Sequence, residues 1–190
     1  MRLLQATFLL LGLAAVSAAG APGPHDLASA EQKLDHIEAN GRSPNPSPTP
    51  TVLSEQEVNA YLASDHVRLP AGVGKVTLEG RNGQITGRTR VDFDRIRAGV
   101  HSSNSLLSVF TGAHDVVVVT HAHGEGGRGH VHVDSVSLDN VEVPPFLLEL
   151  LVEKLLKPMY PDIGLDSEFR LPARIDRAEV GEHEITLIQK

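Results

Sequence analysis

The chain has 190 residues, of which 41% are hydrophobic, 22% charged and 4% aromatic. That length suits one ordinary domain with additional segments. The formal net charge of −7 argues against nucleic-acid binding, which needs a dense positive surface, and against charge-driven adhesion to an anionic membrane. The absence of cysteine excludes disulfides, thiolate catalysis and cysteine-based zinc sites.

The first residues have the three parts of a cleaved secretion signal. Arg2 gives a positive start, residues 3–16 form an apolar run, and residues 17–21 are small. We therefore assign residues 1–21 to a signal peptide, with an uncleaved anchor as the alternative. No later segment reaches the roughly 20 apolar residues that a membrane-spanning helix needs. The mature protein is predicted to be exported, periplasmic or secreted, and an exported chain without cysteine fits a bacterial source.

Residues 22–50 are predicted to precede the domain as a short helix and a linker. The apolar spacing favours a helix over Asp26–Asn40, ended by Gly41. Proline at every second position of residues 43–50 favours an extended linker. Residues 51–190 are then expected to form a single α+β domain.

The domain is predicted to begin with a helix and a hairpin. Ser54 and Glu57 have the spacing of a capping box, and apolar residues follow at helical spacing up to residue 62. Asn82-Gly83 is a strong hairpin turn signal between strands 75–80 and 84–93. Asp94 is predicted to cap the next helix, which carries Ile96 and Val100.

Two further hairpins and a leucine-rich helix complete the predicted fold. The second hairpin runs over residues 115–138 with residues 124–129 as its loop, and the third runs over residues 174–188. Between them a helix is expected over Phe146–Lys157. Hairpins pair neighbouring strands, so the sequence predicts an α+β fold with a strongly curved, largely antiparallel sheet wrapped around one or more helices.

The helix over Phe146–Lys157 is apolar over more of its circumference than one flat sheet can cover. A helix packed on a single surface needs an apolar arc of roughly 100°, and this one has nearly twice that. It is expected either to be buried on several sides as plain core, to form one wall of an apolar ligand groove, or to contact a membrane or another protein. The candidate groove residues are Phe146, Leu147, Leu150 and Leu151.

Four histidines flank the predicted turn of the second hairpin. His121 and His123 share a face of one strand, and His130 and His132 share a face of the next, so the hairpin brings all four imidazoles together. Imidazole suits zinc, copper or nickel. The alternative is a solvent-exposed polar face, and titration with zinc or copper against a variant with four alanines distinguishes the two.

Two other patterns point only weakly to chemistry. Gly124-x-Gly126-x-x-Gly129 matches the dinucleotide fingerprint by letter, but an alternating strand follows it where the fingerprint needs a helix. Asp92 and Asp94 have the spacing of paired carboxylates, although a helix cap explains Asp94. No catalytic residue is therefore predicted, and the chain is predicted not to be an enzyme.

Several short motifs resemble those of a known group of proteins. They are the helix Leu53–Leu62, Leu69-Pro-x-Gly-Val73, Val143-Pro-Pro145 before the leucine-rich helix, and Leu171-Pro172 before the last hairpin. Over residues 50–190 the chain resembles small exported bacterial proteins of unknown function, some of which are similar to the tubular lipid-binding (SMP-like/BPI-like) superfamily. The resemblance implies a long helix wrapped by a twisted antiparallel sheet, with lipid held in the seam by apolar side chains.

These observations together predict an exported, non-enzymatic domain. Its expected partner is a lipid or other apolar molecule held between the leucine-rich helix and a curved sheet, without nucleic acid or a required cofactor. The alternatives are a protein that binds zinc, copper or nickel through the four histidines, and an interaction module of the cell envelope.

Overall fold

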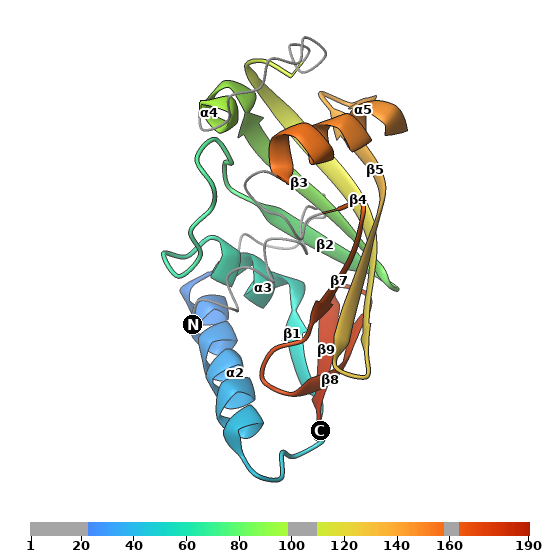
Figure 1. The fold of residues 1–190 in the computed structure, drawn as a ribbon. Helices are drawn as coiled ribbons and strands as arrows, with labels where there is room; N and C mark the ends of the chain where they lie inside the picture. The colour runs from blue at the N-terminus through green and yellow to red at the C-terminus, as the bar shows by residue number, and fades with distance from the viewer. Residues whose placement is uncertain (1–22, 99–109, 158–163) are drawn as a thin grey trace.

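The computed structural model describes residues 23–98, 110–157 and 164–190. Its centre is a nine-stranded sheet in which the strands described pair in antiparallel fashion. The sheet is curved and does not close, and the described helices pack against it (Figure 1). The predicted α+β class and curved antiparallel sheet are confirmed. The proposed signal peptide lies outside the described residues.

The long hairpin β4–β5 organises the sheet. β4 pairs with β3 along most of its length and with β8 near its end, while β5 pairs with β6 and β7 on the other side. β2 and β1 are the outer strands of the path β1-β9-β8-β4-β3-β2. The strands are β1 Thr51–Ser54, β2 Thr77–Arg81, β3 Gln84–Asp92, β4 Ala113–Glu125, β5 Arg128–Leu138, β6 Val141–Glu142, β7 Asp166–Arg170, β8 Ile175–Val180 and β9 Glu184–Gln189. The helices are α2 Pro24–Arg42, α3 Glu55–Leu62, α4 Phe93–Arg97 and α5 Pro145–Leu151, which continues as one turn of π-helix, η2 Val152–Leu156.

Two tight turns set the register of the first two hairpins. Asn82 and Gly83 have φ angles of 44° and 87° and connect β2 to β3, as predicted. Gly126 and Gly127, with φ angles of 59° and 76°, connect β4 to β5. The six-residue loop predicted over residues 124–129 is therefore wrong, because pairing continues through Gly124 and Gly129. The predicted pairing of the histidines is unaffected, because β4 and β5 are each two residues longer at the turn than predicted.

The buried apolar residues form three clusters along one face of the sheet. In an antiparallel pair, directly opposed residues share a face, and the registers place the inward residues of every strand on the same side. The cluster near α4 and α5 contains Val91, Phe93, Phe110, Val116, Val143 and Leu148. The middle cluster contains Leu62, Val76, Leu78, Ile85, Ala122 and Val131. The cluster beneath α2 contains Ala30, Leu34, Ile37, Leu53, Ile175 and Leu187.

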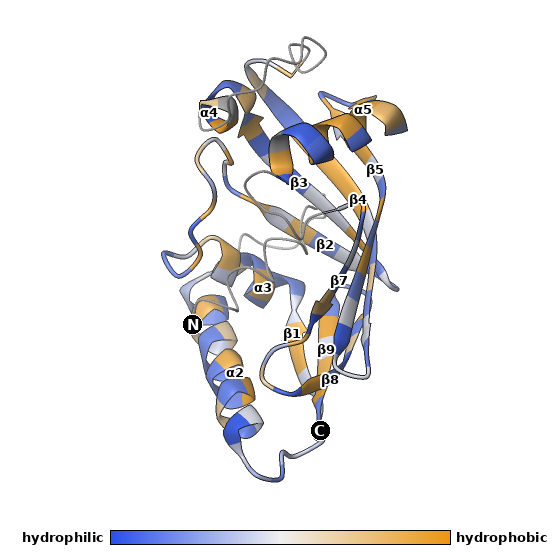
Figure 2. Cartoon of the chain, viewed as in Figure 1, coloured by the Kyte–Doolittle hydropathy of each residue, from blue (hydrophilic) through white to orange (hydrophobic). Residues whose placement is uncertain are grey.

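Helix α2 belongs to this core, although the sequence places it before the domain. Apolar and hydrophilic residues alternate around the helix (Figure 2), and its buried residues recur at helical spacing. The helix runs to Arg42, so the predicted end at Gly41 is wrong. The proline-rich segment 43–50 lies against the helix end, where the Ser47 N–H donates to Asn40 Oδ1 at 2.8 Å.

The cap of α4 also differs from the prediction. Asp92, not Asp94, accepts hydrogen bonds at the helix start, from the N–H groups of Asp94 and Arg95 at 3.1 and 3.0 Å. Asp94 Oδ2 instead accepts the N–H of Gly112 at 3.0 Å. The two carboxylates therefore have structural partners. Val100 lies outside the described residues.

The predicted capping box of α3 is present and also connects α3 to α2. Ser54 Oγ accepts the Glu57 N–H at 3.2 Å, and Glu57 Oε2 accepts the Ser54 N–H at 2.7 Å. The buried Glu57 carboxylate also accepts hydrogen bonds from Ser29 and, at 2.7 Å, from Lys33 on α2. Desolvation by burial raises the pKa of Glu57, but the hydrogen bonds from Lys33, Ser29 and Ser54 outweigh it and hold the pKa below its ordinary value.

Replacing Glu57 by Gln is expected to destabilise the fold by about 2 kcal/mol at neutral pH, because charge-assisted hydrogen bonds to a buried group are lost. Since folding lowers the pKa of Glu57, its contribution is present above the unfolded pKa and is lost as the pH falls through the folded value. Urea unfolding at several pH values measures both effects. Glu153→Gln is the control, because Glu153 pairs with Lys157 on the surface. An equal unfolding midpoint for Glu57→Gln and the unmodified protein contradicts the prediction.

Candidate functional site

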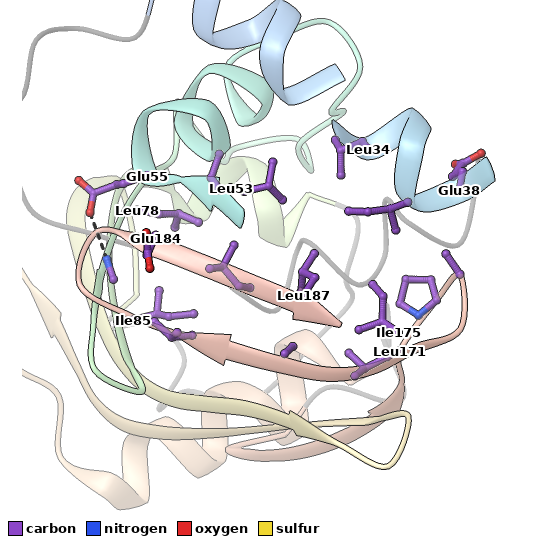
Figure 3. Close-up of a pocket in the computed structure, with 18 residues that line it drawn as sticks. Leu34, Glu38, Leu53, Glu55, Leu78, Ile85, Leu171, Ile175, Glu184 and Leu187 are labelled. Carbon is purple, nitrogen blue, oxygen red and sulfur yellow. Dashed lines mark hydrogen bonds between the residues drawn. The ribbon is translucent and has the colours of Figure 1, made fainter. Parts of the chain in front are cut away.

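An apolar cavity lies between the two N-terminal helices and one end of the sheet. Its volume is about 110 Å³, and it is open along part of its boundary. Figure 3 shows Leu34 above it, and Leu53, Leu187 and Ile175 along its length. The apolar lining residues come from α2, α3, β1, β2, β3, β8, β9 and the segment before β8: Leu34, Ile37, Leu53, Val58, Leu78, Ile85, Leu171, Pro172, Ala173, Ile175, Ala178, Val180, Ile185 and Leu187.

Two of the contacts that hold α2 against the domain are far apart along the helix. At one point Ser29 and Lys33 bind Glu57 of α3. At the other, Gly41 lies so close to Ala173 that an added Cβ would come within 2.3 Å of the Ala173 carbonyl oxygen. Between these contacts the helix passes over the sheet, and small side chains such as Ala178 leave space below it.

Each end of the cavity carries carboxylates. Glu55 and Glu184 lie at one end and Glu38 at the other (Figure 3). Glu55 Oε2 accepts the Gly80 N–H at 3.2 Å and the His183 Nδ1–H at 2.7 Å. The hydrogen bond to Glu55 raises the pKa of His183 above its ordinary value. Glu38 pairs with Arg42 at 2.5 Å, so its charge is balanced.

The four histidines lie together on the opposite, solvent-facing side of the sheet. His121 is opposite His132 and His123 is opposite His130, as the sequence predicts. The rings of His123 and His130 stack with their centroids 5.0 Å apart. A polar hollow of about 300 Å³ lies beside these imidazoles.

Carboxylates from nearby segments already bind two of these imidazoles. His121 Nδ1–H donates to Asp134 at 2.7 Å, and His132 Nδ1–H donates to Asp166 at 2.5 Å. The bond to Asp166 raises the pKa of His132. Within the part of the chain that the structure describes, no three His, Asp or Glu side chains are grouped so that they would hold one metal ion. Binding of zinc, copper or nickel by this face stays a prediction.

The predicted groove residues on α5 lie at the other end of the sheet from α2 (Figure 1). Leu147, Leu150 and Leu151 are half-buried against the cluster around Val116, whereas 63% of Phe146 is exposed. None of these four side chains lines the apolar cavity described above. On α5, Leu148 is buried in that cluster and these three leucines pack around it, whereas the apolar cavity lies among α2, α3 and the sheet.

Sequence reasoning missed the cavity because its walls are distant in the chain. The signals were present separately, in the helical spacing of Leu34 and Ile37 and in the alternation of Ile185 and Leu187. In the fold α2 meets β9 directly, and the Gln189 side-chain N–H donates to the Ile37 carbonyl at 2.8 Å.

The chain matches no protein-family model, no curated protein and no solved structure. Over the described residues, no helix combines the length and apolar character needed to cross a membrane.

Proposed function

We propose that this chain is an exported, non-enzymatic domain that binds a small apolar molecule in the cavity beneath α2. The observation that carries the proposal is the composition of the cavity wall, which is almost wholly aliphatic and yet leaves about 110 Å³ unfilled. Protein interiors normally leave few voids larger than a water molecule. Water is a poor occupant of an apolar void of this size, because a buried water molecule needs polar partners.

The size of the cavity limits the part of a ligand that it holds. An apolar protein cavity of about 150 Å³ takes a benzene molecule, so 110 Å³ suits a short alkyl segment. Burying about five carbons contributes roughly 4 kcal/mol, which corresponds to a dissociation constant near 1 mM. Tighter binding requires a longer chain that extends along the open side of the cavity.

Filling the cavity tests the proposal. Val58→Phe adds a ring from α3 into the space, whereas Val52→Phe adds the same bulk on β1 at a residue that is 38% exposed. We expect Val58→Phe to weaken binding of 1-decanol, measured by isothermal titration calorimetry, about tenfold, at unchanged or higher thermal stability, because a void is filled. The Val52→Phe variant should bind like the unmodified protein. Saturable binding that is equal in all three proteins, or absent from the unmodified one, contradicts the proposal.

A further inference from the structure

The outer face of the β4–β5 hairpin carries two imidazoles that are each oriented by a carboxylate. His121 Nδ1–H donates to Asp134 at 2.7 Å, and His132 Nδ1–H donates to Asp166 at 2.5 Å. A carboxylate that accepts the Nδ1 proton fixes the tautomer of the ring, so that Nε2 carries the lone pair that binds a metal. Histidines that bind a metal almost always donate their other ring N–H to a partner of this kind.

The Nε2 atoms of these two rings are available to an ion. Neither forms a hydrogen bond or ion pair with a described residue, and the His121 and His132 side chains are 59% and 56% exposed. His114 shows the opposite case, because its Nδ1 binds Asp139 and its Nε2 binds the Thr111 carbonyl. A ring with both nitrogens occupied is not available as a ligand, so position on an exposed strand alone does not select His121 and His132.

The strand register brings the two rings within reach of one ion. His121 and His132 are directly opposite each other on β4 and β5, so their side chains share a face, with Cβ atoms roughly 5 Å apart. Zinc–nitrogen bonds of about 2.0–2.1 Å place two nitrogens of a tetrahedral ion roughly 3.3 Å apart, which opposed imidazoles can span. Both residues also line the polar hollow of about 300 Å³, which has room for an ion and its water ligands.

The second pair of histidines lacks this arrangement. The rings of His123 and His130 stack on each other, with their centroids 5.0 Å apart. His130 Nδ1 lies 4.0 Å from Glu168, which is beyond hydrogen-bond distance, and Arg128 already pairs with that carboxylate. No described carboxylate binds His123. The tautomers of these two rings are therefore not fixed in the way that favours a metal ligand.

The geometry points to a binding site for one transition metal ion, held by the Nε2 atoms of His121 and His132. Asp134 and Asp166 orient the two rings. Imidazole ligands suit zinc, copper or nickel, whereas magnesium and calcium prefer oxygen ligands. Since no group of three His, Asp or Glu side chains in the described part of the chain could hold an ion, water completes the coordination. The site is independent of the proposed function, because the apolar cavity lies on the other face of the sheet.

Calorimetric titration of the metal-free protein, without a histidine tag and at neutral pH, tests the inference. We expect one Zn²⁺ per chain, tighter binding of Cu²⁺ and no binding of Mg²⁺. His121→Ala and His132→Ala each remove a ligand, so each should weaken Zn²⁺ binding by at least the roughly tenfold that a lost orienting partner costs. His123→Ala and His130→Ala should leave Zn²⁺ binding nearly unchanged.

The orienting carboxylates provide a second test. Asp134→Asn and Asp166→Asn should each weaken Zn²⁺ binding about tenfold. Asp115→Asn is the control, because Asp115 is an exposed carboxylate of β4 that pairs with Arg90, so its removal changes the charge equally without affecting a zinc ligand. Thermal melting followed by circular dichroism checks that each variant is folded.

Three results would overturn the assignment. The first is the absence of Zn²⁺ and Cu²⁺ binding. The second is a loss on changing His123 or His130 that equals the loss on changing His121 or His132, which would mean that the stacked pair binds the ion as well. The third is equal binding by the Asp134, Asp166 and Asp115 variants. None of these results bears on the apolar cavity, so this site and the proposed function are tested separately.

Discussion

Replacing Gly41 by Ala is expected to destabilise the protein by about 3 kcal/mol, although the residue lies inside helix α2. Helix propensity alone predicts the opposite sign, a gain of about 1 kcal/mol. The close contact with Ala173 outweighs this gain, because the new Cβ would lie 2.3, 2.7 and 2.9 Å from three backbone atoms of Ala173. Backbone atoms cannot rotate away as a flexible side chain does, so α2 must move off the sheet.

Ala39→Gly is the control, because it measures the effect of helix propensity alone in the same turn of α2. Ala39 is exposed, so its replacement should cost about 1 kcal/mol through propensity alone. Urea unfolding of both variants at one pH measures the difference. A Gly41→Ala protein that is more stable than the unmodified one contradicts the close approach of α2 to Ala173, and with it the wall of the cavity.

Replacing Leu53 by Ala is expected to cost about 3 to 4 kcal/mol, since this is the largest fully buried side chain among the described residues. Leu53 is on β1, opposite Ile185 of β9, and lines the cavity. The space left by its removal joins the existing void and enlarges it. The cost should therefore lie in the upper half of the range for such substitutions.

The same substitution should change ligand binding in the opposite direction. A larger cavity accommodates more of an alkyl chain, so 1-decanol should raise the melting temperature of Leu53→Ala by more than that of the unmodified protein. Val52→Ala is the control, because Val52 is the neighbouring residue and 38% exposed. A loss below about 1 kcal/mol for Leu53→Ala argues that the cavity is already filled by relaxed side chains.

Local signals predicted the hairpins because their causes are local. Asn82 and Gly83 adopt the positive φ angles that the turn requires, and the capping box of Ser54 and Glu57 depends on a spacing of three residues. The four histidines met across β4 and β5 for the same reason, since a tight turn fixes the register. These features are encoded within a few residues of where they act.

The errors came from residues whose role depends on distant parts of the chain. The sequence pattern predicts a helix end at Gly41, but the small size of this residue is needed for packing against Ala173. The pattern also predicts Asp94 as the cap of α4, but Asp94 binds Gly112 and Asp92 is the cap. Short strands such as β1 and β7 pair with distant segments and have no turn signal of their own. The cavity depends on such distant pairings, which leave no local signal. The apolar arc of the leucine-rich helix is a local signal, so the sequence analysis places the candidate groove there.

Methyl-resolved NMR during titration with 1-decanol tests the central claim most directly. The reporters are two groups of methyls, those of Leu53, Ile185 and Leu187 in the cavity and those of Leu147, Leu150 and Leu151 on α5. We expect saturable shifts in the first group and none in the second. Saturable shifts confined to α5, or the absence of saturable shifts in the cavity methyls, would show that the space beneath α2 is not the binding site.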